Sequence, residues 1–558
     1  MNFLTQFRNI VSKYPNKLAL CSKGQEITYK TLDEKSNQIA NIILSITKEK
    51  KVLVTLLLSR RVEYVYCLLG AMKAGCAFLP LDIQLPKNRL KYILTKSDSP
   101  ILLSDIDIGK DLNPQCIKID IREISFEEKS NLDISVNICG SDEAYIIFTS
   151  GSTGYPKGVS ITHDALFNLI NSLSEVFFSS SNMCMLANTT FSFDISLLEL
   201  LLPLFSGNRV YITNNLEQKN PKSILRIIQN ESIDILQFTP SYLTLLMSYD
   251  PNLTGFERVK YLLVGGEMVP LSIVKYVQRF KQLRIYNMYG PTEATIWATM
   301  GELTRSDYVH VGFPIKNYEF LIIDNNMQSS TRGELLLAGV GLSSGYYKDI
   351  GLSSEKFCFY NRKRYYKTGD LAYLNPQGKI VILGRLDNQV KIMGHRIELE
   401  EIEQVMLAYP SMQQVVVIKQ NEKLLAFYNA EGDVDVNNLR EYLKRNIPDY
   451  MIPSIFHSVS QIPIMINGKV DRKMLKECLD INNKIENTIV NIISEYGNNN
   501  VSTEMPIKDT GIGSINYVTM LVRIEKQFNF EFDDEALVMD YFHLVSDLME
   551  YVKNKVKS

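Results

Sequence analysis

The sequence lacks the features that mark several large classes of protein. Its 558 residues contain no run of about 18 apolar residues, so no transmembrane helix is expected. The first eight residues lack the charged start and long apolar core of a signal peptide. The eight cysteines form no Cys-x-x-Cys pair and the five histidines stand far apart, which argues against a disulfide framework and a histidine metal site. These absences predict reduced thiols and a cytoplasmic location.

An excess of charge of one sign is also lacking. The chain has 60 Lys and Arg residues against 62 Asp and Glu residues, a formal net charge of −2. This balance argues against a nucleic-acid surface and against a polybasic membrane patch, so neither nucleic acid nor membrane is expected as a partner. A chain of this length exceeds what one hydrophobic core supports, and two to four domains are expected.

A loop rich in glycine and hydroxyl residues follows a short apolar run at residues 145–148, which predicts a buried strand. Inward-pointing N–H groups, hydroxyls and one lysine suit a polyphosphate. The loop is not the common P-loop, because glycine rather than Ser or Thr follows Lys157. Taken alone, it is equally open to interpretation as a flexible segment. Its members are Thr149, Ser150, Gly151, Ser152, Thr153, Gly154 and Lys157.

Strand and helix patterns alternate over the first ~310 residues, which predicts a largely parallel sheet covered by helices. From about residue 318 the pattern is shorter and strand-rich, which favours a small antiparallel sheet or barrel. Residues 448–453 read as a rigid extended connector, and Asn482–Asn483 as the start of a polar linker. Beyond them, apolar residues at helical spacing predict an independent helical bundle.

Four polar or aromatic residues each allow two interpretations. Asp194 either caps the helix that follows or pairs with a cationic ligand. Trp297 fills the core or lines a site. Lys469 lies in a tight turn and, taken alone, is a solvated residue. Ser514 starts a helix, where it is an ordinary cap or carries a phosphate ester.

Ten motifs, taken in order, resemble the adenylation domain of nonribosomal peptide synthetases followed by a peptidyl carrier domain. The resemblance implies an α/β multidomain fold: a large N-terminal adenylate-forming domain of layered sheets and helices, a small α+β subdomain, and an all-α four-helix carrier. The implied boundaries are 1–386, 387–478, a linker at 479–484, and 485–558. The motifs lie at 27–32, 72–82, 148–158, 193–196, 287–293, 333–335, 366–370, 384–391, 448–453 and 467–472.

The family resemblance implies that ATP activates an amino acid to aminoacyl-AMP with release of pyrophosphate. The loop from Thr149 to Lys157 would hold the leaving phosphates. Lys469 would bridge the amino acid carboxylate and the α-phosphate, and Glu293 would bind Mg²⁺. Tyr289 and Asn287 are assigned to adenine, and Asp370 with Arg385 to the ribose; further nucleotide contacts are Gly266, Gly290 and Thr292.

The resemblance implies a second half-reaction as well, in which the aminoacyl group moves to a thiol. Asp387 would be the hinge that brings Lys391 and Gly394 to the site. Ser514 would carry 4′-phosphopantetheine, attached by a phosphopantetheinyl transferase, although Gly513 departs from the usual residue before this serine. The product would pass to a condensation or tailoring enzyme in trans. Whether a small MbtH-like activator protein is needed stays open.

Carried over by position, the substrate pocket predicts a very small amino acid. Asp194 would pair with the α-ammonium, while Trp297 and Met288 fill most of the space. No second charge is present, so glycine is predicted, with alanine second. Gln237 is expected to bond the Trp297 N–H or a water. Competing interpretations are an acyl- or aryl-CoA ligase and a non-catalytic carrier scaffold. The lining is Asp194, Ile195, Leu198, Gln237, Leu263, Gly265, Met288, Ile296, Trp297 and Lys469.

Overall fold

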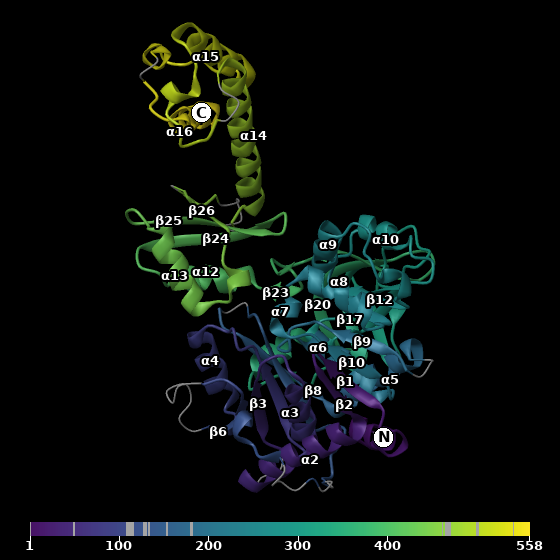
Figure 1. The fold of residues 1–558 in the computed structure, drawn as a ribbon. Helices are drawn as coiled ribbons and strands as arrows, with labels where there is room; N and C mark the ends of the chain where they lie inside the picture. Colours follow the sequence, from purple (N-terminus) through teal and green to yellow (C-terminus); the bar gives the residue numbers. More distant parts are fainter. Residues whose placement is uncertain are drawn as a thin grey trace. The chain divides into compact units, whose positions relative to one another are not determined.

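The computed structural model describes residues 2–47, 51–107, 116–126, 131, 134, 136–151, 154–178, 182–459, 461–463, 470–497, 501–538 and 541–557, with the backbone alone at 477–483, 514, 515 and 557. The chain forms two compact units, residues 1–457 and 458–558 (Figure 1). The boundary expected at residue 386 falls within the first unit, and residues 387–457 contact the preceding core there, for example through the ion pair of Arg89 with Glu401.

The largest sheet has nine strands in the order β15-β14-β13-β12-β11-β9-β10-β1-β2. Neighbours from β13 to β1 are parallel, and antiparallel strands complete both edges. The predicted parallel sheet is thus confirmed. Its strands are β1 (Leu18–Ser22), β2 (Gln25–Thr28), β9 (Cys184–Ala187), β10 (Arg209–Ile212), β11 (Ile235–Phe238), β12 (Tyr261–Gly265), β13 (Arg284–Tyr289), β14 (Thr299–Glu302) and β15 (Phe313–Pro314).

A second sheet has seven strands in the order β18-β8-β7-β4-β3-β5-β6. Strands β7, β4, β3, β5 and β6 run parallel, whereas β8 returns antiparallel after the glycine-rich loop. The strands are β3 (Leu53–Leu57), β4 (Ala77–Leu81), β5 (Ile101–Ser104), β6 (Ile117–Asp120), β7 (Glu143–Thr149), β8 (Lys157–Thr162) and β18 (Gly345–Tyr346).

Helices cover both sheets, and α2 packs against α3 (Figure 1). Helix α6 differs from the others because it is apolar on all sides and fully buried between α5 and strands β9 and β10. It begins at Asp194, so the helix expected to follow this residue includes it. The helices are α1 (Phe3–Lys13), α2 (Tyr29–Ile46), α3 (Val62–Lys73), α4 (Lys87–Ser97), η1 (Ile121–Glu123), α5 (His163–Phe177), α6 (Asp194–Phe205), α7 (Asn215–Gln218), α8 (Pro221–Asn230), α9 (Pro240–Tyr249), η3 (Phe256–Arg258), α10 (Leu271–Val277) and η4 (Thr292–Ala294).

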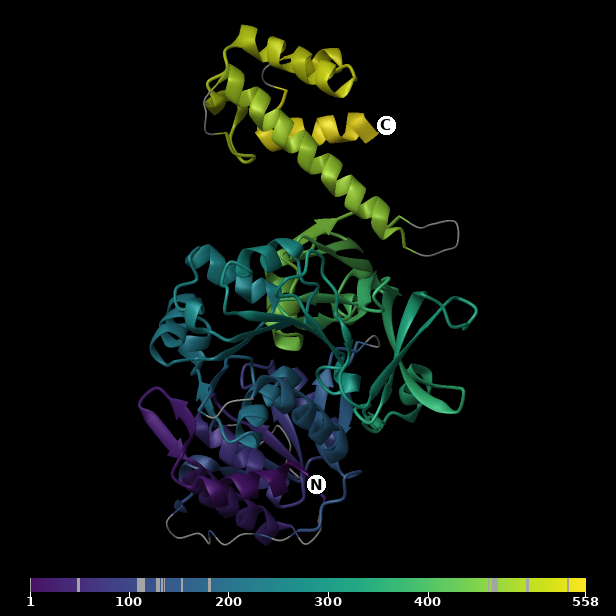
Figure 2. The same cartoon turned by 90° about the vertical axis from the view of Figure 1, so that its right-hand side faces the viewer.

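The strand-rich region after residue 318 forms the expected antiparallel sheet, here with five strands (Figure 2). Its elements are β16 (Tyr318–Ile323), β17 (Arg332–Gly339), α11 (Ile350–Lys356), β19 (Phe357–Tyr360), β20 (Lys363–Leu374) and β21 (Ile380–Arg385).

The α+β segment that follows has its own apolar core. The connector at 448–453, expected to be extended, contains a 3-10 turn, η5 (Asp449–Met451). The other elements are β22 (Val390–Ile392), β23 (His395–Ile397), α12 (Leu399–Leu407), β24 (Met412–Gln420), β25 (Lys423–Ala430), α13 (Val436–Asn446) and β26 (Ile455–Ser458).

The second unit is helical, as expected, and buries isoleucines such as Ile485, Ile489 and Ile493. The expected linker at 479–484 is wrong, since these residues lie within one continuous helix, α14 (Arg472–Tyr496). Its other described elements are η6 (Ile507–Thr510), α15 (Ser514–Phe528), η7 (Asp534–Leu537) and α16 (Val545–Lys557), so the described residues form three α-helices rather than four. Throughout the described chain, every helix is too short or too polar to cross a membrane.

Candidate active site

Three neighbouring parallel strands of the nine-stranded sheet, β11, β12 and β13, end at one edge, where ligands bind in open α/β sheets. The end of β7 and the start of α6 reach the same place. Together they line a cavity of about 120 Å³, whose walls include Asp194, Tyr289 and Trp297. A larger cavity of about 880 Å³ shares Tyr289, Trp297, Asp370 and Lys391 with it.

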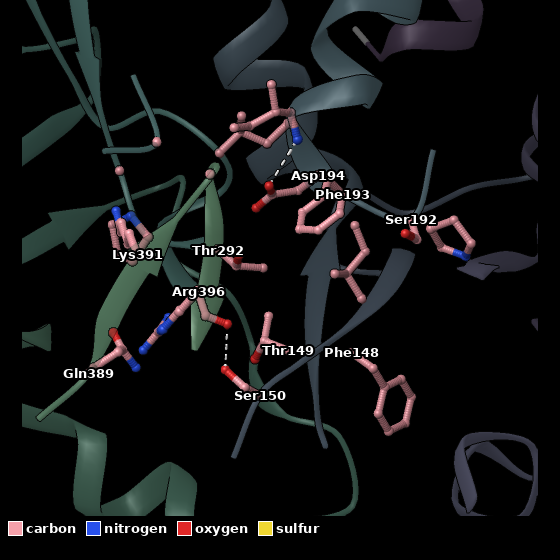
Figure 3. Close-up of a pocket in the computed structure, with 18 of the residues that line it drawn as sticks. Phe148, Thr149, Ser150, Ser192, Phe193, Asp194, Thr292, Gln389, Lys391 and Arg396 are labelled. Atoms are coloured by element: carbon pink, nitrogen blue, oxygen red, sulfur yellow. Dashed lines mark hydrogen bonds between the residues drawn. The ribbon is translucent and has the colours of Figure 1, made fainter. Parts of the chain in front are cut away.

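The glycine-rich loop begins where β7 ends and ends where β8 begins. A Cβ at Gly151 would lie 2.1 Å from the Tyr155 carbonyl oxygen, so only glycine fits there. Ser150 Oγ donates to the Arg396 carbonyl at 2.7 Å, and Gly151 N–H donates to Glu401 Oε2 at 3.2 Å (Figure 3). In this arrangement the loop therefore bonds to residues 396–401 rather than presenting these donors to a free cavity.

Lys157, the first residue of β8, is buried, and burial lowers its pKa. Its Nζ lies 3.5 Å from Glu398 Oε1 and 5.1 Å from the centre of the Tyr346 ring. Among the predicted loop residues, Ser152 and Thr153 lie outside the described part of the chain.

The residues assigned to the nucleoside lie together, with Tyr289 and Arg385 at the ends of β13 and β21 and Asp370 within β20. Asp370 and Arg385 face each other in the sheet register, with Arg385 Nη1 donating to Asp370 Oδ1 at 3.0 Å. Tyr289 Oη donates to Asp370 Oδ2 at 2.6 Å. Asn287 Nδ2 donates to the His310 carbonyl at 3.1 Å. Each Asp370 oxygen keeps further acceptor capacity, which two ribose hydroxyls can use.

Glu293 is fully buried, and its Oε2 accepts from Arg396 Nη1 at 2.7 Å. Tyr346 Oη donates to its other oxygen at 2.6 Å. Burial opposes ionisation of Glu293, but the positive charges of Arg396 and Lys157 outweigh it and hold the pKa at about 2. Glu293 is thus an ionised carboxylate whose present partner is a guanidinium.

The hairpin of β22 and β23 reaches into the site and carries Lys391 and Gly394. Lys391 lines both cavities, and burial lowers its pKa. The Gly394 N–H donates to Glu267, and a Cβ at Gly394 would lie 2.6 Å from Thr239 Cγ2. Glycine is therefore required where the hairpin touches the end of β11.

Asp387, the expected hinge, follows β21 directly. Both of its oxygens accept from Arg385, at 2.7 and 2.6 Å, and its pKa is lowered by these bonds against the opposing effect of burial. Arg385 therefore links Asp387 to the carboxylate of Asp370, the residue predicted to bind ribose.

Asp194 is the first residue of α6, and its Oδ1 accepts from the Ile195 N–H at 2.9 Å (Figure 3). The cap position is Phe193, so the interpretation of Asp194 as the helix cap does not hold. Burial raises the pKa of Asp194, while a bond with the Thr292 side chain opposes the rise. None of the ion pairs within the described residues involves Asp194, which suits a carboxylate that receives a cationic ligand.

Trp297 forms one wall of the cavity. It is 2% exposed, and its Nε1 donates to Gln237 Oε1 at 3.0 Å, which confirms one of the two bonds expected for Gln237. A Cβ at Gly265 would lie 2.7 Å from the edge of the indole. Ile195 and Ile296 line the same cavity, and Met288 lines the larger one. Leu198, Gln237, Leu263 and Gly265 stand outside both linings.

The structure thus brings together the described residues of the predicted nucleotide and amino acid sites. Lys469 lies outside the described residues, and at Ser514 only the backbone is described, at the first position of α15. Sequence reasoning missed the partners that hold the site: Arg396, Glu398, Glu401 and Tyr346. It also missed Glu199, although an acid among the leucines of α6 was a visible signal.

Comparison with known proteins agrees with this geometry. The model of the AMP-binding enzyme family matches residues 7–347, and that of the AMP-binding enzyme C-terminal domain matches residues 401–469. Zwittermicin A synthase ZmaJ of Bacillus cereus is 36% identical over 84% of this chain and 93% of its own length.

Two further relatives differ in length and in similarity. A dimodular nonribosomal peptide synthase of Bacillus subtilis (strain 168) is 35% identical, but the match spans only 20% of that protein. Among solved structures, NpsA-ThdA, an artificially fused adenylation-PCP di-domain from Klebsiella oxytoca, superposes with a TM-score of 0.73 at 22% identity, covering 95% of this chain and 97% of that one. This last likeness concerns the fold.

Family match, sequence identity and site geometry lead to the same assignment. The chain belongs to the AMP-binding enzymes of the adenylate-forming superfamily and contains a nonribosomal peptide synthetase adenylation domain.

Proposed function

We propose that this protein activates glycine with ATP, forming glycyl-AMP and pyrophosphate, and then transfers the glycyl group to a phosphopantetheine thiol on its own Ser514. The observation that supports glycine most is the buried indole of Trp297, which lines the same small cavity as Asp194. Alanine, one methyl larger, is the second substrate, at a disadvantage of about 1–3 kcal/mol.

In the first half-reaction the glycine carboxylate attacks the α-phosphate of ATP. Asp194 pairs with the ammonium group and fixes the direction of the carboxylate. The loop donors and Lys157 stabilise charge on the leaving pyrophosphate, and Lys469 is assigned to the α-phosphate. Because the loop donors and Lys157 now face residues 396–401, the segment after Asp387 must move before they can hold phosphate.

Glu293 suits a magnesium ion once the segment after Asp387 has moved. Mg²⁺ takes oxygen ligands and commonly uses one or two carboxylates together with phosphates and water. Glu293 is a buried, ionised carboxylate, but Arg396 occupies its Oε2 in this arrangement. When bound, the ion supplies positive charge to the phosphates; the protein supplies Glu293 once Arg396 has left it.

The present arrangement suits the second half-reaction. Lys391 lines the cavity, where the charges of Asp370 and Asp194 favour its protonated form. Its positive charge stabilises the departing AMP. Ser514 begins α15, where a phosphate ester is favoured by the helix N-terminus. The NpsA-ThdA di-domain, which joins an adenylation domain to a PCP, supports a carrier in residues 485–558. The loaded product then passes to a condensation or tailoring enzyme.

The test is acid-dependent exchange of pyrophosphate into ATP, measured across the twenty amino acids and a set of aryl and acyl acids. Glycine is expected to give the highest rate and alanine the second. No exchange with any small amino acid contradicts the activation step. A preference for an aryl or acyl acid points instead to a CoA-ligase-like activity, and silence with every acid points to a scaffold.

A further inference from the structure

Glu199 is a fully buried carboxylate inside the apolar helix α6, on the helix that also carries Asp194. Its Oε2 accepts from the backbone N–H groups of Asn188 and Thr189, both at 2.9 Å. Its Oε1 accepts from Thr189 Oγ1 at 2.6 Å and from Gln237 Nε2 at 3.1 Å. All four partners are donors, so the carboxylate acts only as an acceptor.

The Gln237 amide is held in one direction by its neighbours. Its Nε2 donates to Glu199 Oε1 and to the Ile195 carbonyl, at 3.1 and 3.3 Å. Its Oε1 accepts from Trp297 Nε1, which can only donate. Turning the amide over would place its NH₂ against the indole N–H and its oxygen against a carboxylate. The chemistry of Glu199 and Trp297 therefore fixes the amide orientation.

The main chain before Trp297 is strained in the same region. Thr295 and Ile296 both have positive φ values, 50° and 67°, which β-branched residues seldom adopt. Thr295 Oγ1 anchors the turn by donating to the Gly341 carbonyl at 2.7 Å. A strained turn persists only where several contacts determine it, and the indole bond to Gln237 is one of them.

We propose that Glu199 is a positioning residue for substrate selection: through the directed Gln237 amide it holds the Trp297 indole as a fixed wall that keeps alanine out of the glycine site. The inference rests on the proposed glycine activation. Arg60, buried beside this network, balances the carboxylate, since its guanidinium donates to the Ala187, Thr189 and Thr213 carbonyls and attracts Glu199.

The decisive variant is Glu199→Gln, which keeps the shape and removes the all-acceptor character. If the new amide keeps its oxygen on the two backbone N–H groups, its NH₂ faces Gln237. Gln237 then turns over and presents its NH₂ to the indole N–H. The glycine-to-alanine ratio of kcat/KM is expected to fall roughly tenfold, mainly through a lower KM for alanine. Because Trp297 is the only tryptophan, its fluorescence should shift as well.

The matched control is the same substitution in a Trp297→Phe background, where no indole N–H remains to conflict with the amide. There the ratio should not change further, and a double-mutant cycle measures the coupling. An unchanged ratio and spectrum in Glu199→Gln alone, or an equal drop in both backgrounds, overturns the proposal.

A second variant covers the case in which Glu199→Gln does not fold. Gln237→Met keeps the length of the side chain but offers the indole no oxygen, and the same fall in ratio is expected. A wild-type ratio in Gln237→Met overturns the proposal. Failure of the underlying function looks different, because the unsubstituted protein would then show no glycine-dependent exchange.

Discussion

The part of the site that we assign to the amino acid and the part that we assign to phosphate are built differently. On the amino acid side, Asp194, Gln237 and Trp297 come from α6, β11 and the turn after β13, all within the N-terminal core. On the phosphate side, core groups bond to residues after the hinge: Glu293 to Arg396, Lys157 to Glu398, Ser150 to the Arg396 carbonyl. The first side is fixed by packing within the core, whereas the second side is made by residues that lie before and after Asp387 in the chain.

This difference separates the residues that we assign to selecting the amino acid from those that we assign to the phosphates. The wall that we propose to distinguish glycine from alanine must tolerate little movement, and buried packing with directed hydrogen bonds provides that rigidity. Donors that first hold phosphate and later release it need partners that can be exchanged, and ion pairs across a hinge provide those. Substitutions on the fixed side should change which amino acid reacts, whereas those on the shared side should change which half-reaction proceeds.

The strongest test of the side shared across Asp387 compares the Lys469→Ala variant with the Ser514→Ala variant. Removing the charge assigned to the α-phosphate should lower glycine-dependent pyrophosphate exchange by roughly a hundredfold or more. Ser514→Ala should leave exchange intact and abolish covalent loading, measured by mass spectrometry after treatment with a phosphopantetheinyl transferase. Loading of the Ser514→Ala protein, or full exchange by Lys469→Ala, would refute the corresponding assignment.

On the fixed side the largest effect is expected from Trp297→Ala. Loss of the indole opens the cavity beside Asp194, so larger amino acids should gain activity while glycine loses kcat/KM by roughly ten- to a hundredfold. Exchange assays with alanine, serine and valine measure the change. Gly265→Ala is the companion variant, since a Cβ there meets the Met288 carbonyl oxygen at 2.4 Å and the indole edge at 2.7 Å, and should displace both without removing the indole. Unchanged selectivity in both would show that the wall lies elsewhere.

The sequence predicts the local features of this arrangement better than its long-range contacts. Strands, helices and the glycine-rich loop were predictable, because periodicity and turn chemistry are local properties. Asp194 and Asp370 were identified because recognisable motifs carry them, and Trp297 was assigned by its position after the motif at 287–293. The bonds between Arg396 and Glu293 and between Gly151 and Glu401 were not predictable, because they join residues more than 100 positions apart.

The errors have local causes. The pair Asn482–Asn483 indicates a linker by composition, yet the isoleucines on both sides of it continue the period of α14 and keep the helix intact. Glu199 was overlooked because the sequence of a leucine-rich helix does not reveal the hydrogen-bond donors of a buried acid. One of these donors lies on the neighbouring strand β11. The role proposed for Glu199 depends on Gln237, which stands 38 positions further along the chain.

A smaller effect is expected from Arg396→Ala. Arg396 holds Glu293 in the present arrangement, so its loss should slow transfer to the carrier by roughly tenfold while pyrophosphate exchange changes little. Single-turnover loading compared with exchange separates the two half-reactions. Arg396→Lys, which keeps the charge but not the forked geometry, should recover part of the loss. Equal losses in both assays would mean that Arg396 also acts while ATP is bound.

The smallest effect concerns pH and His395, whose ring stacks on Tyr450 at 3.6 Å and meets Phe193 of the core edge-on at 4.6 Å. Burial lowers the pKa of His395 from 6.5 to about 4. When the segment after the hinge moves away, the ring regains water and its ordinary pKa, so the packed arrangement binds fewer protons between these values. The packing of the His395 ring therefore gives its full stabilisation above about pH 6.5, and this stabilisation decreases as the pH falls towards about 4.

Hydrogen exchange of residues 390–397, corrected for the intrinsic chemical rate, should consequently increase a few-fold between about pH 7.5 and about pH 5. The amides around Trp297 should respond less, because the His395 ring contacts Phe193 and Tyr450 rather than the indole. His395→Gln should abolish the pH response of 390–397. An equal response in that variant would assign the proton to another group, and a parallel response at Trp297 would mean that the two sides of the site move together.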